Sequence, residues 1–210
     1  MSFATITPTR GDRGKLLGFQ AERVFSKVPY SIVCCEEPKS DAIDIVPRIK
    51  HGIEVAKRHG YDFVFIVEDD DFLVDDYFKS WGDLSQYDFV GFSDTVYYHL
   101  GNQTYQTFIH PSRSSLFCTG FRISALDSFT WPSDSTKFLD IVLWEYAIRS
   151  KKRVSLLPNN PNLGIKGHGI GKAAGKGHEM TMANKDKDFQ YLKSRVDETS
   201  FQFYTNLLKS

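Results

Sequence analysis

Residues 63–71 read FVFIVEDDD. The first five are apolar and rich in β-branched and aromatic side chains, which is typical of a strand buried on both faces of a sheet. Four carboxylates follow without a break, those of Glu68, Asp69, Asp70 and Asp71. Carboxylates this close at the end of a buried strand raise each other's pKa unless a cation lies among them. The stretch predicts a central strand that delivers an acidic group to the edge of a sheet.

The acidic group indicates a site for a metal and a diphosphate. Oxygen ligands suit the hard cations Mg²⁺, Mn²⁺ and Ca²⁺. Mg²⁺ in particular is usually held by one or two carboxylates together with the phosphates of a substrate. The competing interpretation is a solvated strand end that leads into a helix, where Asp is also favoured by capping and by the helix dipole.

The composition of the whole chain limits the classes of protein to consider. The 210 residues are 41% apolar, which suits one globular domain with a substantial core. Lys plus Arg equal Asp plus Glu at 26 each, so no overall field draws the protein to nucleic acid or to an anionic membrane. The three cysteines lack ligand spacing and indicate neither a disulfide framework nor a zinc site. With no signal-peptide pattern and no membrane span, we expect a soluble, cytoplasmic protein.

Strand and helix patterns alternate before the acidic stretch. Residues 3–7 and 30–35 read as strands, while residues 14–27 and 40–60 carry apolar residues at helical spacing. This order predicts a right-handed, mainly parallel α/β unit, in which ligands lie beyond the carboxyl ends of the strands. The loop TPTRGDR after the first strand also falls there. It offers hydroxyls and two guanidinium groups to a nucleotide, although an ordinary strand-to-helix turn explains it equally well.

The second half of the chain differs in pattern. Residues 95–118 alternate in polarity around turn residues and predict a β-hairpin that extends the sheet with antiparallel strands. Three tyrosines there either stack on a sugar ring or are half-buried strand residues, and we favour the second interpretation: Tyr97, Tyr98 and Tyr105. A helix is expected over residues 137–150, and it presents Asp140 beside apolar residues. Asp140 then either serves as a base, or caps the helix or forms a salt bridge to Lys137 or Arg149.

The end of the chain is predicted as a loop and a helix. Residues 159–187 are rich in Gly, Asn and Lys and read as a flexible basic loop, which could fold over a diphosphate as a lid. Lysines of this loop would then neutralise charge, and one histidine would complete the metal shell. Residues 188–208 read as one aromatic-rich amphipathic helix that packs on the core.

Four stretches, in order over residues 3–172, together resemble the GT-A fold glycosyltransferases: TITPTRGDR, RIKHGIEVAKRHGYDFVFIVEDDD, FCTGFRISALDSFTWPSDSTKFLDIVLWEYAIRSKKRVSLLP and LGIKGHGIGK. The chain is similar to family 2-like enzymes of this fold, and its acidic stretch to the Glu-Asp-Asp region of N-acetylglucosaminyltransferase I. The resemblance implies a Rossmann-like, mixed and mainly parallel sheet flanked by helices, with an antiparallel hairpin on the acceptor side. One domain, 1–210, would hold a nucleotide-sugar half over 1–95 and an acceptor half over 96–158.

The resemblance also implies roles for individual residues. The metal ligands would be Asp70 or Asp71, between which the motif does not choose, together with His168, which matches better than His178. The third stretch usually carries an acidic pair, which here reads Leu139 and Asp140, so Asp140 alone matches the general base. The donor would contact the residues Thr7, Pro8, Thr9, Arg10, Asp12, Arg13, Glu68, Asp69 and Lys172, with Lys166 as a further candidate at the phosphates.

These roles together describe a metal-dependent transferase. Mn²⁺ or Mg²⁺ would bridge the diphosphate of a nucleotide sugar, with uridine diphosphate the favoured carrier, and Asp140 would act as base in an inverting reaction. The acceptor stays open among a glycan, a protein hydroxyl, a small metabolite and a hydroxymethylated DNA base as in viral glycosyltransferases. If the chain is viral, the site of action is the host cytoplasm. The alternatives are a calcium-dependent carbohydrate-binding module and a sugar-nucleotide pyrophosphorylase, which would show a longer glycine- and arginine-rich first loop.

Overall fold

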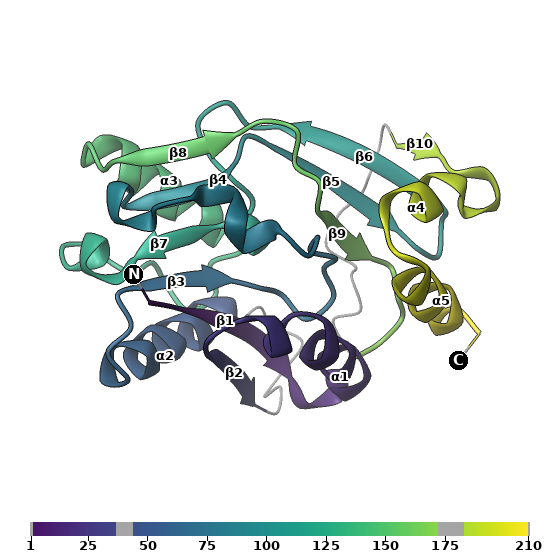
Figure 1. Ribbon diagram of the computed structural model, residues 1–210, viewed down its shortest axis with the longest axis horizontal. Helices are drawn as coiled ribbons and strands as arrows, with labels where there is room; N and C mark the ends of the chain where they lie inside the picture. The colour runs from purple at the N-terminus through teal and green to yellow at the C-terminus, as the bar shows by residue number, and fades with distance from the viewer. Residues whose placement is uncertain (1, 37–43, 172–182, 210) are drawn as a thin grey trace.

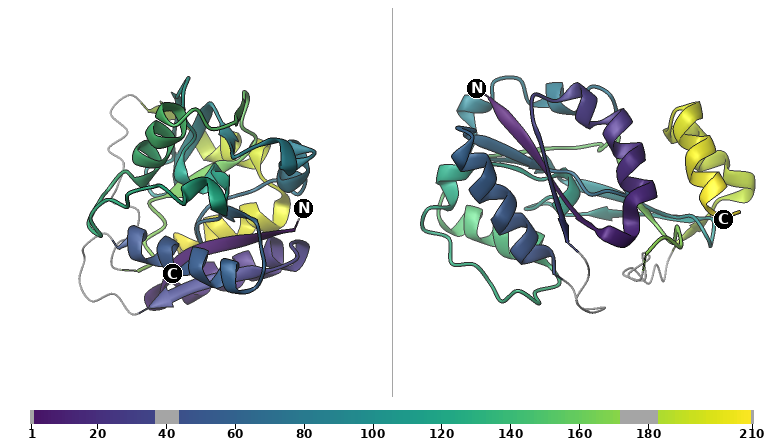
Figure 2. Two further views of the ribbon diagram at one scale, coloured as in Figure 1. Left: turned by 90° about the vertical axis from the view of Figure 1, so that its left-hand side faces the viewer. Right: turned by 90° about the horizontal axis from the view of Figure 1, so that it is seen from below.

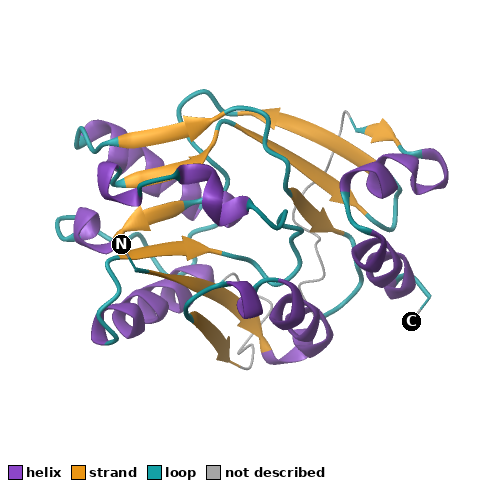
Figure 3. Cartoon of the chain, in the orientation of Figure 1, coloured by secondary structure: helices purple, strands orange, loops and turns teal. Residues whose placement is uncertain are grey.

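The computed structural model describes residues 2–36, 44–171 and 183–209. Within these residues the strands form two sheets, one of six strands in the order β2-β1-β3-β7-β4-β8 and one of four in the order β10-β6-β5-β9 (Figures 1 and 3). The strands of the larger sheet are β1 Phe3–Arg10, β2 Ser31–Glu36, β3 Phe63–Ile66, β4 Phe89–Phe92, β7 Gly120–Arg122 and β8 Val154–Leu157. Its strands run parallel except for β7, which is antiparallel to both of its neighbours.

The order in which the chain adds strands to the larger sheet reverses at β1. Helix α1, Gly14–Arg23, leads from β1 to its neighbour β2. Helix α2, Ile45–Arg58, leads from β2 back across β1 to β3, the neighbour of β1 on its other side. Because such crossovers are right-handed, the two helices lie on opposite faces of the sheet, as Figure 2 shows. The carboxyl ends of β1 and β3 are therefore neighbours at a topological switch point, where open α/β sheets bind their ligands.

The central strand β3 is buried on both faces, as its sequence predicts. Val64 and Ile66 join the apolar cluster beneath α2 and α3, the latter helix spanning Leu139–Arg149, whereas Phe63 and Phe65 pack in a second cluster on the other face. Alternate side chains of one strand thus enter two cores, which explains why the strand reads as a continuous apolar run.

The smaller sheet consists of β5 Asp94–His99, β6 Thr104–Ile109, β9 Leu163–Lys166 and β10 Asn184–Lys185. The predicted hairpin exists as the antiparallel pair β5 and β6, but the prediction that it extends the first sheet is wrong. β5 starts two residues after β4 ends and turns away to pair with β9 in parallel. This pairing gives the apolar residues of β5 and β9 a third core, which they share with α1 and the C-terminal helices.

Two predictions for the end of the chain need correction. Leu163–Lys166 is a fully buried strand, so residues 159–187 are not a continuous loop, and residues 172–182 lie outside the described residues. The single C-terminal helix is in fact two, α4 Gln190–Arg195 and α5 Glu198–Leu207. Asp197 begins α5 as its N-cap, accepting a 2.9 Å hydrogen bond from Ser200 N, which the pattern of apolar residues alone did not reveal.

Short 3₁₀ helices fill several connections: Gly11–Arg13, Phe25–Lys27, Tyr77–Trp81, Leu84–Gln86, Leu116–Cys118, Ile123–Leu126 and Lys187–Phe189. No helix in the described ranges has both the length and the apolar character that crossing a membrane requires.

Gly120 in β7 gives a test of how tightly the larger sheet is packed. A Cβ at this position would lie 2.6 Å from the Phe65 ring and 2.9 Å from Val90 Cγ2, so Gly120→Ala must displace core side chains. We expect a loss of about 1–3 kcal/mol in the free energy of unfolding, measured by urea titration. Gly18→Ala is the matched control, because nothing lies within 4 Å of its Cβ position and alanine favours the helix. Equal stability of the two variants would contradict the packing described here.

Candidate active site

The acidic residues after β3 lie in a turn that is fixed at both ends. Val67 N donates a 3.0 Å hydrogen bond to Ile6 O, and Phe72 exchanges backbone hydrogen bonds with Leu163. Inside the turn, the buried Gln20 side chain of α1 donates to the carbonyl oxygens of Glu68, at 3.0 Å, and Asp71, at 2.5 Å. The turn does not continue into a helix, since the next helical residue is Tyr77. Helix capping therefore does not account for the carboxylates.

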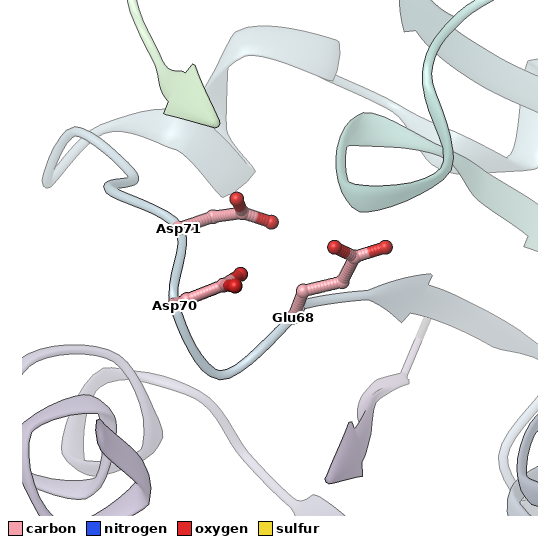
Figure 4. A group of neighbouring side chains, drawn as sticks. All are labelled: Glu68, Asp70 and Asp71. Atoms are coloured by element: carbon pink, nitrogen blue, oxygen red, sulfur yellow. The ribbon is translucent and has the colours of Figure 1, made fainter. Parts of the chain in front are cut away.

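Three of the four carboxylates converge on one point. One oxygen from each of Glu68, Asp70 and Asp71 lies within 4.8 Å of the other two, and Figure 4 shows the three side chains directed into the same space. Asp70 and Asp71 are buried, whereas Glu68 is partly exposed. The group therefore combines two buried oxygen donors with one that is open to solvent.

A lysine reaches into this group from β9. Lys166 Nζ lies 3.5 Å from Glu68 Oε2, 3.3 Å from Asp70 Oδ1 and 3.5 Å from Asp71 Oδ1. The prediction placed Lys166 at the phosphates of a substrate, but the structure places it among the carboxylates. Sequence alone concealed this contact because 96 positions separate Lys166 from Asp70.

His168 contacts the acidic group as a hydrogen-bond partner. Its Nε2 lies 3.1 Å from Asp70 Oδ2, while its Nδ1 accepts a 3.0 Å hydrogen bond from Ile170 N. A ring nitrogen that accepts carries no proton, so the proton of the neutral ring is on Nε2 and is donated to Asp70. His168 thus orients Asp70, and ligation of a metal by Nε2, as predicted, would require the hydrogen bond from Ile170 to break.

The pKa values of the crowded carboxylates are shifted in opposite directions. Burial opposes ionisation of Asp70, but Lys166, His168 and Arg13 outweigh it and hold the pKa of Asp70 below its usual range. Burial raises the pKa of Asp71 well above its usual value, with Lys166 only partly opposing the rise. Neither carboxylate oxygen of the buried Asp71 has a hydrogen-bond partner among the described residues. An oxygen pair of this kind fits a hard divalent cation, which would satisfy both atoms.

Asp69 is not part of this group, and it joins the acidic turn to the loop after β1. It accepts hydrogen bonds from Thr9 Oγ1 and, at 2.6 Å, from Arg13 Nη1. Arg13 Nη1 also lies 3.6 Å from Asp70 Oδ2. The two stretches that sequence analysis placed at the same edge of the sheet are therefore in direct contact.

A cleft of about 140 Å³ opens beside Asp69, and it is lined by Pro8, Thr9, Arg10, Arg13, Asp44, Ile45, Arg48, Glu68 and Asp69. Six of the predicted donor-binding residues are among these. Two others are not among them: Thr7 is fully buried, and Asp12 lies against Gly171. The role predicted for Lys172, like that of His178, falls outside the described residues.

Three residues that complete the cleft were not predicted from the sequence, namely Asp44, which precedes α2, and Ile45 and Arg48 of α2. The buried Arg48 donates from Nη1 to Thr9 O, at 2.5 Å, and to Cys34 O, at 3.1 Å. Its Nη2 donates to Asp44 Oδ2 at 2.7 Å, and Arg10 Nη2 lies 3.4 Å from the other oxygen of Asp44. A signal was available, because Arg48 lies among the apolar positions of the helix and follows Asp44 by four residues.

Asp140 lies in the first turn of α3 and is not among the residues that line the cleft beside Asp69. It accepts a hydrogen bond from Arg113 Nη1, whereas Arg149 pairs with Glu145. Arg113 precedes Ser114, whose hydroxyl accepts from Phe92 N at the carboxyl end of β4. Burial raises the pKa of Asp140, and Arg113 opposes the rise. A second cleft, of about 520 Å³, includes Arg113 and the neighbouring Ile141 but not Asp140 itself, and it is lined by Ser112, Arg113, Ile141, Trp144, Glu145, Ile148 and Arg149.

No protein-family model and no curated protein matches the sequence. Among solved structures, a Drosophila β1,4-galactosyltransferase 7 mutant, in complex with manganese, UDP-Gal and xylobiose, superposes with a TM-score of 0.54 over 96% of this chain and 79% of that one. The sequence identity is 11%. The chain has a GT-A fold.

Two further structures have lower scores. Protein A197 from STIV covers 75% of this chain and 82% of its own, with a TM-score of 0.48 and 14% identity. A glycosyltransferase involved in glycosylation of the major capsid of PBCV-1 covers 77% of this chain and 83% of its own, with a TM-score of 0.46 and 12% identity. The predicted fold class, a mixed and mainly parallel sheet flanked by helices, is confirmed.

Proposed function

We propose that this chain is a metal-dependent glycosyltransferase that moves a sugar from a nucleoside-diphosphate sugar to an acceptor hydroxyl. One observation carries the proposal: Glu68, Asp70 and Asp71 converge at the switch point of a GT-A fold, beside the cleft at the carboxyl end of β1. A nucleotide in the cleft would place its diphosphate next to the carboxylates. The assignment as a glycosyltransferase rests on the fold and on the geometry of the carboxylates, whereas the substrates are inferred from the residues that line the cleft.

The lining of the cleft offers a hydrogen-bond acceptor that suits uracil as the base of the donor. Arg48 and Arg10 outweigh the burial of Asp44 and lower its pKa, so Asp44 is ionised and acts only as an acceptor. It is one-third exposed and can accept a hydrogen bond from the ring N–H of uracil, although guanine has the same donor and the amino groups of adenine and cytosine also donate. Uridine diphosphate is the carrier that we propose, as the sequence resemblance also implies.

The residues in and around the acidic group would have different roles in the reaction. Glu68, Asp70 and Asp71 would hold Mn²⁺ or Mg²⁺, and His168 would keep Asp70 in position. When bound, the ion supplies positive charge that stabilises the departing diphosphate. Arg13, held by Asp69, presents a second positive charge at the wall of the cleft. Lys172 stays a candidate for the phosphates.

Asp140 is the proposed general base. As a carboxylate at the carboxyl edge of the sheet, it would take the proton of the acceptor hydroxyl while that oxygen attacks the anomeric carbon. Attack from the face opposite the diphosphate inverts the configuration of the sugar. Arg113 holds Asp140 and limits the rise of its pKa, so the base is ionised over a wider range of pH.

The two alternatives have less support from the structure. A carbohydrate-binding module would use the tyrosines as a platform, but Tyr98 is buried and donates to Asp186, and Tyr105 stacks on Tyr191 with ring centroids 3.6 Å apart. A pyrophosphorylase would need a longer first loop. Here β1 is followed directly by the 3₁₀ turn Gly11–Arg13 and then by α1.

The proposal is tested by measuring thermal unfolding with a panel of nucleoside diphosphates and nucleotide sugars, each with Mn²⁺ or with a chelator. A ligand that binds only the folded protein stabilises it by about 2.7 kcal/mol when its concentration is a hundred times its Kd. The melting temperature rises as a result. We expect the uridine compounds to give the largest shift and the chelator to abolish it. A shift with Ca²⁺ and free sugars, and none with any nucleotide, would contradict the proposal and favour the binding module.

A further inference from the structure

Lys166 has an unusual position for a lysine. Its side chain is 11% exposed, and its ammonium lies within 3.5 Å of all three carboxylates that converge after β3. Buried lysines are rare unless they are paired, because the ammonium loses its hydration. Here three acidic partners compensate for that loss. The Lys166 ammonium therefore already supplies a positive charge to these three carboxylates.

The backbone of Lys166 cannot easily withdraw from this position. β9 pairs in parallel with β5, with His99 opposite Lys166, and Leu100 N donates a 2.8 Å hydrogen bond to Lys166 O. The side chain passes Tyr97, with Nζ 5.8 Å from the centre of its ring. Any change in the contacts of the ammonium must therefore come from rotation of a flexible side chain on a fixed strand.

The same three carboxylates offer the oxygens that a divalent ion would use. Two cations held by one set of oxygens repel each other, and this repulsion is little screened when the group is buried. Counted over the described part of the chain, four carboxylates from 68 to 71 face the two cations Arg13 and Lys166, so with all of them ionised two negative charges remain. The remaining negative charge thus favours binding of a divalent ion, but the Lys166 ammonium already contacts the carboxylates that would be its ligands.

We infer that Lys166 is a tethered cation that occupies the carboxylate site of the metal-free protein, and that a divalent ion binds there in competition with it. The inference rests on the proposed function, because it concerns the same metal site. Lys166 holds the carboxylates together before the ion arrives and weakens the binding of the ion. Removing its charge therefore strengthens metal binding, which is the opposite of what is expected if Lys166 merely maintains the shape of the site.

The test is the affinity for Mn²⁺ without nucleotide, measured by isothermal titration calorimetry on the wild type and on Lys166→Gln. Glutamine removes the charge and keeps an amide that can donate to the carboxylates. We expect the Kd of the variant to be at least about fivefold lower, the smaller end of the usual range of coupling between two sites. Lys166→Arg keeps the charge and should behave as the wild type does. Lys15→Met, an exposed position on α1, makes the same change in net charge as Lys166→Gln.

Thermal unfolding gives a second measurement on the same proteins. Without its ammonium the site holds mutually repelling carboxylates, so Lys166→Gln should melt lower than the wild type in chelator and gain more from Mn²⁺. An unchanged or weaker affinity in Lys166→Gln, with normal binding by the wild type, overturns the inference and leaves the metal site intact. Failure of both proteins to bind Mn²⁺ without nucleotide overturns the inference, whereas the metal dependence of the proposed function is decided separately, by nucleotide binding with Mn²⁺ and with chelator. Binding by the variant alone supports the inference, because the ammonium of the wild type then excludes the ion.

Discussion

Nucleotide binding that depends on Mn²⁺ is expected to disappear when Asp70 and Asp71 are both replaced by asparagine. The two substitutions keep the size of the side chains but remove the two buried anionic donors of the site. Loss of a partner outside the ligand shell already costs about 10–100-fold in metal affinity, so loss of two ligands should cost more than about a hundredfold. The measurement is calorimetric titration of uridine diphosphate with Mn²⁺ present, repeated with chelator.

The same loop offers a matched control for this experiment. Asp75 and Asp76 are 72% and 75% exposed, and they form surface ion pairs with Lys27 and Lys79. Their double change to asparagine alters the net charge equally but should leave binding unchanged, because exposed pairs contribute little. If the Asp70 and Asp71 variant kept its Mn²⁺-dependent binding, the carboxylates after β3 would not be the metal ligands.

Asp140→Asn is expected to retain donor binding and to lose transfer by about 10²–10⁴-fold, the usual contribution of a general base. Asparagine can still accept from Arg113, so the contact between the helix and the loop before Ser114 is preserved. The measurements are the turnover of nucleotide sugar with an acceptor and the Kd of uridine diphosphate. Glu145→Gln is the control, because this acidic residue lies on the same helix, α3, but pairs with Arg149 at the surface. Full transfer by Asp140→Asn would exclude Asp140 as the base.

The pH dependence of transfer gives a second test of Asp140. A base acts when ionised, so kcat/KM should fall as pH decreases through the pKa of Asp140, which burial raises above the usual carboxyl value. Arg113 opposes this rise. Arg113→Gln should therefore move the acid limb of the profile to higher pH, whereas a purely structural role for Arg113 would lower the rate at every pH without moving the limb.

Much of the site could be predicted because its parts are local in sequence. The strand before Glu68 is a continuous apolar run, and the loop after β1 ends a β-rich segment, so both could be placed at the carboxyl edge from strand order alone. Their direct contact, through Asp69 and Arg13, agrees with that placement. Strand order does not place Gln20 or Arg48, because a polar residue in an amphipathic helix usually faces solvent, and only Arg48 has a local signal, its position among apolar residues four places after Asp44.

The acidic turn and the fold class follow from the sequence itself, since apolar periodicity and the order of strands and helices are properties of neighbouring residues. Only the tertiary structure decided which positively charged side chain contacts each carboxylate. Lys166 meets Asp70 because β9 pairs with β5 in a second sheet, and Arg113 meets Asp140 because the end of β4 brings its loop to α3. Contacts between residues that are distant in sequence depend on strand register and on burial, and neither leaves a local pattern in the chain.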